Sequence, residues 1–514
     1  MLRKVIKSQV FKRLLLSLLS AILLILSFPR FNIEIFAWFG FLPLFFALRN
    51  KSKLQAFILA YITGVIFWFG IIYWLIHVTL PGMVILVLYL ALYFAFFGLI
   101  VSRRSVLCTW YSVLFIPSLW VVLEYLRSHL LTGFPWALLG YSQYLNLPAI
   151  QIADITGAWG VSFLVMMANV AIREIICYRP QATGHRQKIK KILFLVCGLW
   201  FVACGYGFFR LNQNIEGNKI KISVIQGNIP QELKWQAESE DFIIKKYMTI
   251  TAEALKENPD LIVWPEASVP VILGDDRFLY QNIKGFIKSA SLPMLLGAVT
   301  KEDEQFYNNA LLISREGELL AKYSKLHLVP FGEYIPFKKT FSFLETVVPI
   351  GDFTAGKEYT VFKLQAPSSK LQANFSVLIC FEDLFPELSR EFVKRGADFL
   401  INITNDAWFK RTSSPYQHLQ ASVFRAVENR LPLLRSANTG ISGFIAPNGK
   451  ILSLVQDKTG RNIFIGGFAT EEIAITKGNL TFYTRYGDIF IIICFLVILG
   501  GIFIYAKHYS FGNN

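Results

Sequence analysis

Residues 375–387 read FSVLICFEDLFPE and form an apolar run with strand character that stops at Cys380. Acidic residues follow, and then a helix-like segment over residues 384–395. A cysteine placed where a buried strand ends and a helix begins can be held with its sulfur facing a cleft, and the nearby helix N-terminus favours the thiolate. The stretch therefore predicts a catalytic nucleophile. Plain core packing of Cys380 is the alternative, because free cysteine is among the most buried residue types.

The composition indicates a membrane protein. The chain has 514 residues, of which 54% are hydrophobic, and this fraction is too high for an ordinary soluble protein. Its formal net charge of +16 comes from Lys and Arg in short clusters that flank apolar segments. Basic residues in such positions set membrane topology, so no nucleic-acid partner is expected. The six cysteines show no paired metal-ligand spacing, and neither a zinc site nor a disulfide framework is predicted.

Eight apolar segments have roughly the length that spans a bilayer. The first resembles a signal peptide, but no small-x-small cleavage site follows it, so we expect it to remain as a membrane helix. Basic clusters alternate between the loops, and the positive-inside rule then places both ends of the chain in the cytoplasm and the large segment after the seventh span outside it. The predicted spans cover residues 14–28, 33–49, 54–77, 82–102, 106–126, 153–176, 191–209 and 487–506.

These features divide the chain into three parts. Residues 1–213 are predicted to form a membrane bundle of seven helices, residues 214–484 a separate domain, and residues 485–514 the eighth helix with a cytoplasmic tail. Within the spans, Glu124 is the clearest charged residue, and near its helix end we expect it to snorkel or to pair with Arg127. The long aromatic loop that follows is expected to form an interfacial belt or, alternatively, to line a lipid entry path.

The region after the seventh span has the pattern of an α/β domain. Short strand-like runs alternate with helical stretches such as residues 238–257 and 414–429, which predicts helices packed on the faces of a sheet. The expected strands are residues 220–225, 261–264, 293–297, 309–314, 375–379, 399–403, 433–436 and 443–446.

Two further charged residues of this domain stand beside strand-like runs. Glu266 directly follows LIVWP, and Lys325 lies in AKYSKLHLVPFGEY. A glutamate beside Cys380 can take the thiol proton, and a nearby lysine can stabilise the oxyanion of a tetrahedral intermediate. Read singly, either charge could be an ordinary exposed side chain. A Cys/His arrangement with His327 or His418 is the competing constellation.

These residues stand in motifs that resemble the carbon–nitrogen hydrolase (nitrilase) superfamily: Glu266 in WPE, Lys325 in YSKLHLVPFGE and Cys380 in ICFED. A nitrilase-like domain inserted between a seventh and an eighth membrane span resembles the bacterial apolipoprotein N-acyltransferase family. The resemblance implies a polytopic helical membrane bundle of about eight spans, joined to an extracytoplasmic α/β domain of the nitrilase-like α-β-β-α sandwich type. Further matching motifs, in order, are FPRF, FGIIYW, GFPWALLGYSQ, GAWGVSFL, VIQGNIPQELKW, NITNDAWF, RAVENRLPLLRSANTGIS and FYTRYGD.

The resemblance also implies roles for individual residues. Cys380 would be the nucleophile, Glu266 the general base, and Lys325 the stabiliser of the tetrahedral intermediate. Position 381 holds Phe where Tyr is equally expected, so this chain would not use a hydroxyl group there. The supporting or substrate-binding residues implied by the resemblance are Glu333, Glu382, Phe381 and Trp235.

The implied reaction is a ping-pong acyl transfer without metal or other cofactor, in the bacterial inner membrane with the catalytic domain in the periplasm. Cys380 would take an acyl chain from a phospholipid, typically phosphatidylethanolamine, as a thioester. The α-amino group of the N-terminal diacylglyceryl-cysteine of a lipoprotein would then attack it. Both substrates are anchored by acyl chains whose extraction costs about 0.8 kcal/mol per CH₂, so the site must come to the bilayer surface.

Two other classes of function are open at this point. A membrane-tethered amidase or nitrilase would use the same three residues to hydrolyse a small amide, although one membrane anchor would suffice for it. A non-catalytic lipid-binding or scaffold protein would have no need of an intact Cys, Glu and Lys.

Overall fold

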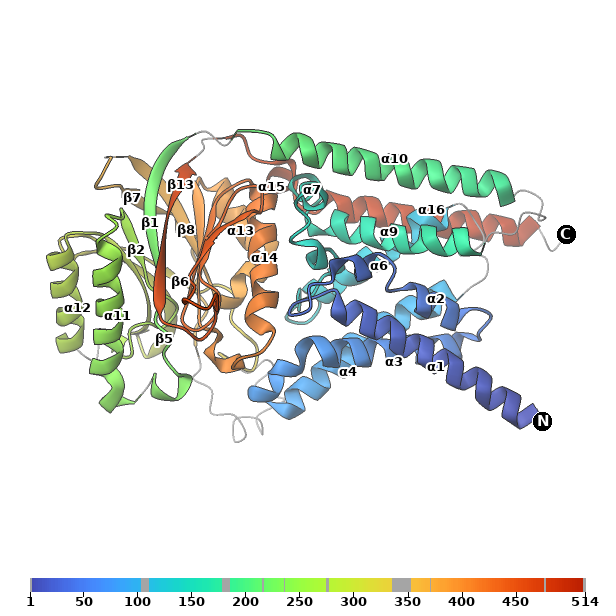
Figure 1. Ribbon diagram of the computed structural model, residues 1–514, viewed down its shortest axis with the longest axis horizontal. Coiled ribbons are helices and arrows are strands. Elements are labelled where there is room, and N and C mark those ends of the chain that lie inside the picture. The colour runs from blue at the N-terminus through green and yellow to red at the C-terminus, as the bar shows by residue number, and fades with distance from the viewer. Residues whose placement is uncertain are drawn as a thin grey trace. The chain divides into compact units, whose positions relative to one another are not determined.

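The chain forms two compact units in the computed structural model, which describes residues 2–102, 111–177, 185–214, 217–234, 236–273, 277–334, 353–369, 371–475 and 478–511 (Figure 1). One unit, here called the membrane unit, comprises Met1–Asn212 and Tyr486–Asn514. The other, here called the catalytic unit, comprises Gln213–Arg485. Apolar helices build the first, whereas two sheets and their covering helices build the second.

Long apolar helices dominate the membrane unit. Helix α3 begins at a capping box in which Ser52 and Gln55 exchange hydrogen bonds, which satisfies donors that the first turn leaves free. Among the described helices, five stretches are long and apolar enough to cross a bilayer: Gln9–Leu26, Lys53–His77, Leu80–Val101, Ala158–Ile176 and Arg186–Leu211. The α-helices of this unit are α1 (Leu2–Leu26), α2 (Leu42–Leu48), α3 (Lys53–Ile72), α4 (Leu80–Val101), α6 (Ser112–His129), α7 (Leu147–Ile150), α8 (Ala153–Thr156), α9 (Ala158–Ile176), α10 (His185–Leu211) and α16 (Ile489–Phe511).

The count of eight spans stays a prediction. The segment 33–49 is interrupted, because it folds as the 3₁₀ helix η1 (Glu34–Trp38) followed by the short helix α2. The segment 106–126 begins outside the described residues and continues in α6. The last segment, 487–506, coincides with helix α16, which is apolar over Ile489–Ile504.

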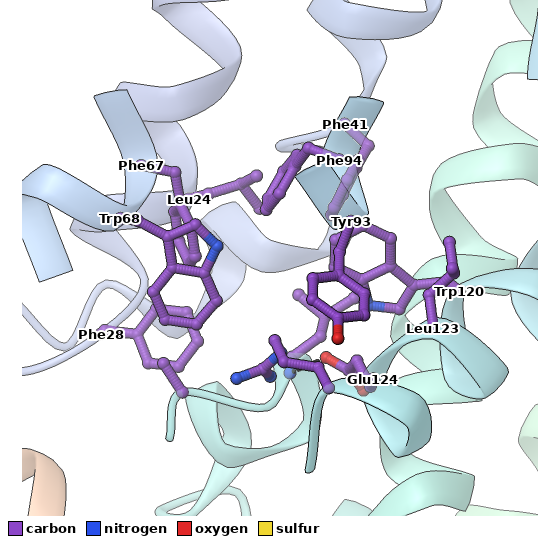
Figure 2. Close-up of a pocket in the computed structure, with 13 residues that line it drawn as sticks. Leu24, Phe28, Phe41, Phe67, Trp68, Tyr93, Phe94, Trp120, Leu123 and Glu124 are labelled. Carbon is purple, nitrogen blue, oxygen red and sulfur yellow. Dashed lines mark hydrogen bonds between the residues drawn. The ribbon is translucent and has the colours of Figure 1, made fainter. Parts of the chain in front are cut away.

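An aromatic pocket inside the membrane unit contains a buried carboxylate and a buried guanidinium (Figure 2). Glu124 is 3% exposed, so it does not snorkel. Its Oε1 accepts a hydrogen bond of 2.7 Å from the N–H of Leu139. Arg127 lies 4.7 Å from the centre of the Trp68 ring, and its Nη1 donates to the carbonyl oxygen of Trp136 at 2.8 Å. Both charged groups therefore hold the main chain of the loop that follows α6.

That loop folds back into the membrane unit. Trp136 packs on Trp74 with ring centroids 5.0 Å apart, and Tyr141 is 1% exposed. Gln143 accepts a hydrogen bond of 3.0 Å from Nε1 of Trp38. The expectation of an interfacial aromatic belt is thus wrong for Trp136 and Tyr141, because their rings are packed against protein instead of lipid headgroups.

The first sheet of the catalytic unit has seven strands in the order β13-β1-β2-β4-β5-β6, with β3 paired to β4. The neighbours β1, β2 and β4 run parallel, and the other pairs on this path are antiparallel. Helices α11 (Glu240–Leu255) and α12 (Arg277–Ala290) cover its outer face through a core that includes Tyr247, Trp264 and Ile283. The strands are β1 (Asn218–Gln226), β2 (Leu261–Val263), β3 (Ile272–Leu273), β4 (Met294–Glu302), β5 (Gln305–Ile313), β6 (Leu319–Ser324) and β13 (Gly467–Ile475).

The second sheet has six strands in the order β12-β11-β10-β9-β8-β7, of which β8, β9 and β10 run parallel. Helices α13 (Pro386–Lys394) and α14 (Ser414–Asn429) cover its outer face, so that the unit is an α-β-β-α sandwich (Figure 1). Ser436 ties the sheets together, because its hydroxyl lies 2.9 Å from the carbonyl oxygen of Ile225 and 3.1 Å from that of Val263. The strands are β7 (Phe362–Gln365), β8 (Gln372–Ile379), β9 (Phe399–Thr404), β10 (Leu433–Ala437), β11 (Gly443–Ile445) and β12 (Ile451–Leu454).

The sandwich confirms the fold class expected from the sequence. Every strand expected there overlaps an observed strand, and α14 has the expected bounds. The strands that the pattern did not reveal include β7, β12 and β13, which carry exposed or half-buried residues along much of their length, whereas β6 overlaps the start of the strand-like run expected over residues 321–334. A strand of this kind lacks the continuous apolar run by which the buried strands are recognised.

Candidate active site

Cys380 directly follows β8 and is the first residue of the 3₁₀ helix η7 (Cys380–Leu384), which forms a strained turn there. Its φ of +53° lies in the left-handed region, which a non-glycine residue adopts at a cost of roughly 1–3 kcal/mol. Nδ2 of Asn402 donates to the carbonyl oxygens of Cys380 and Leu378, both at 3.1 Å. Because Asn402 lies on β9, the parallel neighbour of β8, the sheet itself holds this turn.

Glu382 fastens the turn to the segment that follows β6. Its carboxylate is fully buried, and Oε2 accepts a hydrogen bond of 2.7 Å from the N–H of Ile379. Oε1 accepts hydrogen bonds from the hydroxyl of Tyr323 at 2.8 Å and from the N–H groups of Leu326 at 2.7 Å and His327 at 3.0 Å. Burial raises the pKa of Glu382 to about 7, although the bound N–H groups favour the charged form. Glu382 therefore holds the main chain of the Cys380 turn against that of residues 326–327 through hydrogen bonds.

Glu266 follows β2 and is 7% exposed. Its Oε1 accepts a hydrogen bond of 2.8 Å from Nδ2 of Asn308 and lies 3.7 Å from Nζ of Lys325. Gly297 on β4 is required for this packing, because a Cβ there would come within 2.3 Å of the Pro265 carbonyl oxygen. The close approach of two backbones thus positions the carboxylate.

Lys325 lies directly after β6 and is 1% exposed. Its Nζ donates to Oε1 of Glu333 at 2.9 Å. Glu333 also accepts hydrogen bonds from Nδ2 of Asn308 at 3.0 Å and from the N–H of Val329 at 2.8 Å. Burial alone lowers the pKa of Lys325, but the carboxylates of Glu333 and Glu266 outweigh it, and the pKa lies above its ordinary value. Lys325 is therefore a permanent cation between two carboxylates that Asn308 bridges.

The thiol of Cys380 lies within electrostatic reach of both Glu266 and Lys325. Burial raises the pKa of the thiol, the negative charge of Glu266 raises it further, and Lys325 lowers it by less. The pKa is far above its ordinary value, so the resting group is a neutral thiol. The expectation that the N-terminus of the helix over residues 384–395, observed as α13, would favour the thiolate is wrong, because desolvation of the thiol dominates.

The two histidines of the competing arrangement make contacts with other groups. The ring of His327 stacks on that of Phe385, with centroids 3.7 Å apart. Nε2 of His418 lies 2.8 Å from Oδ1 of Asp383 and 3.2 Å from the carbonyl oxygen of Cys380, while Nδ1 lies 3.1 Å from Asp406. Burial alone lowers the pKa of His418, but the two aspartates outweigh it and raise the pKa to about 9. A histidine that is already protonated at neutral pH cannot accept the thiol proton.

Of the two remaining residues implied by the resemblance, Phe381 and Trp235, the structure describes only Phe381. Phe381 is half-buried, and its ring lies 5.1 Å from Phe385 and 6.0 Å from His327 between centroids. An aromatic cluster therefore forms directly beside Cys380. Trp235 lies outside the described residues.

Sequence reasoning missed two polar residues of the site. Asn308 contacts both Glu266 and Glu333, and Lys234 donates to the main-chain oxygen of Glu266 at 3.0 Å. A signal for Lys234 was present, since it stands in QELKW directly before Trp235. Asn308 lies within a strand and carried no comparable signal. Among the described residues, no group of three or more His, Cys, Asp and Glu side chains could hold a metal ion.

The α-β-β-α sandwich is the fold of the carbon–nitrogen hydrolase class. A family model described as Carbon-nitrogen hydrolase matches residues 221–474, and one described as Apolipoprotein N-acyltransferase N-terminal domain matches residues 20–171. The apolipoprotein N-acyltransferase of Geobacter metallireducens is 40% identical over 497 residues, which cover 93% of this chain and 92% of the relative. That of Pasteurella multocida is 30% identical over 497 residues, which cover 92% and 91%. The chain belongs to the apolipoprotein N-acyltransferase family.

Proposed function

We propose that this protein transfers an acyl chain from a phospholipid to the α-amino group of the N-terminal diacylglyceryl-cysteine of lipoproteins. One observation carries the proposal: a cysteine on a strained turn stands beside a buried lysine that two carboxylates hold. Family membership adds the membrane unit and the class of acceptor named in the relatives. Small-amide hydrolysis, the alternative, has no comparable use for the five apolar helices of membrane-spanning length among the described residues.

In the first half-reaction, Glu266 takes the proton of the Cys380 thiol while the sulfur attacks the ester carbonyl carbon of the phospholipid. A neutral thiol beside a carboxylate suits this coupled step, because no buried thiolate has to persist before substrate arrives. The ammonium of Lys325 stabilises the oxyanion of the tetrahedral intermediate. The C–O bond then breaks, Glu266 returns the proton to the leaving alkoxide, and a lysophospholipid departs from a Cys380 thioester.

In the second half-reaction, the α-amino group of the lipoprotein attacks the thioester carbonyl carbon. Glu266 takes a proton from the attacking nitrogen, and Lys325 again stabilises the oxyanion. The C–S bond breaks, the sulfur leaves as a thiolate, and the proton held by Glu266 restores the thiol. The product is an amide, and the enzyme returns to its starting state without a cofactor.

We assign the supporting residues from their contacts. Glu333 keeps Lys325 charged, since their 2.9 Å contact is what counters the desolvation of the ammonium. Glu382 holds the cysteine turn through main-chain hydrogen bonds. Phe381 offers apolar surface for the bound acyl chain, and we assign Trp235 to the substrate on the family resemblance alone.

The experiment that tests the reaction is intact-mass measurement after incubation with a phospholipid of defined acyl chain. We expect a mass increase of one acyl group that hydroxylamine removes and that Cys380→Ser lacks. Phosphatidylethanolamine should load faster than phosphatidylglycerol of the same chain. A folded protein that forms no adduct but releases ammonia from small amides would support the hydrolase alternative.

We place the protein in the bacterial inner membrane with its catalytic unit in the periplasm. The expected alternation of basic loops supports this orientation. A polar maleimide that does not cross membranes should label Cys380 from the outer face of cells, with Cys380→Ala as the control for other cysteines. Labelling that requires access from the cytoplasm would overturn the orientation.

A further inference from the structure

Lys234 is a second buried lysine in the catalytic unit, beside the residues that carry the proposed reaction. It follows the 3₁₀ helix η4 (Gln231–Leu233) and is 2% exposed. Its Nζ donates to the main-chain carbonyl oxygen of Glu266 at 3.0 Å. Full burial of a lysine side chain is uncommon unless its charge has a specific partner. The partner here is the backbone of the residue to which we assign the role of general base.

The segment that carries Lys234 is itself fixed in place. Nδ2 of Asn405 donates to Oε1 of Gln231 at 2.7 Å, and Oδ1 of Asn438 accepts a hydrogen bond of 2.8 Å from the N–H of Ile229. Asn405 and Asn438 follow β9 and β10, so this segment is anchored to the second sheet. Lys234 thereby connects that sheet to the base that follows β2 in the first sheet.

The backbone that Lys234 holds is in an unusual conformation. Ala267, the residue after Glu266, has a φ of +44°, in the left-handed region. On its other side, Ser268 anchors the turn by donating its N–H to the carbonyl oxygen of Gly297 at 2.9 Å. Lys234 supplies the anchor on the Glu266 side. The direction of the Glu266 carboxylate therefore depends on two opposed main-chain contacts.

The pKa of Lys234 depends on Glu266 and Cys380, the two groups between which we propose that the proton moves. Burial lowers the pKa of Lys234 to about 8. The carboxylate of Glu266 and the sulfur of Cys380 act in the opposite direction, because they favour the charged form. Lys325 differs, because its two carboxylates hold its pKa above the ordinary value. One lysine of the site thus stays charged, whereas the other loses its proton in the mildly alkaline range.

We propose that Lys234 is a positioning residue for acyl transfer: its ammonium fixes the main chain of the base Glu266 and adds positive charge beside Cys380. The inference rests on the proposed function, in which Glu266 takes the thiol proton. Loss of the ammonium frees the carbonyl oxygen of Glu266 and removes a charge that stabilises the forming thiolate. Small displacements of a catalytic group have large kinetic effects.

The test compares Lys234→Met, Lys234→Arg and Lys246→Met. Lys246 is the control, because its Nζ also donates to a main-chain carbonyl oxygen, but to that of Asn228 at 3.0 Å and not to that of Glu266. We expect Lys234→Met to slow thioester formation on the order of 10- to 100-fold at pH 7. Lys234→Arg should recover part of the rate, and Lys246→Met should behave as wild type. Thermal unfolding of each variant separates loss of fold from loss of rate.

The pH profile distinguishes positioning from a merely structural role. In the wild type, the rate of thioester formation should fall as pH rises through about 8, where Lys234 loses its proton. In Lys234→Arg this fall in rate should move to higher pH, because arginine stays protonated. In Lys234→Met the fall should be absent. The groups that interact with Lys234, which are Glu266 and Cys380, are unchanged in all three variants. So are two other groups of this unit with a pKa in this range, His418 near 9 and Glu382 near 7.

A second readout does not depend on phospholipid. The rate at which iodoacetamide alkylates Cys380 at pH 7 should fall severalfold in Lys234→Met and stay near wild type in Lys246→Met. A wild-type alkylation rate and pH profile in folded Lys234→Met would overturn the inference. Failure of the wild type to form a thioester, with the expected alkylation pattern intact, would count against the proposed function and leave the role of Lys234 supported.

Discussion

Each unit of this protein buries a carboxylate with a cation, and the two pairs differ in what they contact. In the membrane unit, Glu124 and Arg127 bind the main chain of one loop through the N–H of Leu139 and the carbonyl oxygen of Trp136. In the catalytic unit, Glu266 and Lys325 lie 3.7 Å apart within a network of side chains, beside a thiol. Buried charge alone therefore does not identify a site of chemistry.

The partners explain the difference. Main-chain groups do not titrate, so the contacts that Glu124 and Arg127 make with them fix the position of a loop. Carboxylates, a lysine and a thiol change one another's pKa values, and this coupling allows protons to move. We thus expect substitutions in the catalytic pair to reduce the rate without unfolding the protein, and substitutions in the membrane pair to do the reverse.

The largest effect should come from Cys380→Ala. Removal of the sulfur should reduce thioester formation on the order of 10⁴-fold or more, because nothing else can form the covalent intermediate. Intact mass after incubation with phospholipid measures this loss. Cys197→Ala is the control, since that cysteine is exposed on α10. Activity near wild type in Cys380→Ala would remove the nucleophile from the mechanism.

Glu266→Gln should rank next. The amide keeps the size of the side chain but cannot accept the thiol proton, so single-turnover thioester formation should slow by about 10²- to 10⁴-fold. Thermal stability should change little. Glu302→Gln removes an exposed carboxylate that pairs with Lys322 at 2.6 Å and should leave the rate unchanged. Equal rates for the two variants would show that Glu266 is not the base.

Arg127→Met should lower stability and leave the rate of thioester formation unchanged. It leaves Glu124 buried without its neighbouring cation and removes the hydrogen bonds to the loop, at a cost of about 3–5 kcal/mol of stability. Thermal unfolding in detergent measures that loss, and thioester formation per folded molecule should stay near wild type. Arg13→Met, at a partly exposed arginine that also binds main-chain carbonyl oxygens, should cost less. A rate loss without a stability loss would contradict the comparison.

The smallest effect concerns His418. Its folded-state pKa of about 9 exceeds the ordinary value of 6.5, so protonated His418 stabilises the fold fully below about pH 6.5. This contribution, at most about 3 kcal/mol, is lost as pH rises towards 9. The difference in unfolding free energy between wild type and His418→Asn should therefore shrink over that range. Denaturant unfolding at several pH values measures it, and a constant difference would count against a protonated His418.

Much of the catalytic unit was predictable because its signals are local. Buried strands such as β8 and β9 are mostly apolar runs, and Cys380 and Glu266 stand where such runs end. Strand β13 was missed because its burial alternates weakly. The count of membrane spans was harder, since the segment 33–49 has the apolar length of a span and yet folds as two short helices.

The network around the reacting groups was less accessible to sequence reasoning. Asn308 is separated from Glu266 by 42 positions in the sequence, and Lys234 is separated from Glu266 by 32 positions. No local pattern therefore predicts either contact. The state of the Cys380 thiol was also misjudged. Its pKa follows from burial and from charges that the fold brings near, and neither is visible in the residues beside it.

Local sequence determined the membrane character of the chain and the alternation of strands and helices, and it singled out Cys380, Glu266 and Lys325, to which we assign the reaction. Hydrophobic periodicity and residue chemistry are properties of short stretches, so they can be read without a structure. Only the tertiary structure decided that Lys325 remains charged, that the Cys380 thiol is neutral and that Lys234 donates to the main-chain oxygen of Glu266. Proton affinity depends on desolvation and on neighbours, and only folding brings distant residues into that range.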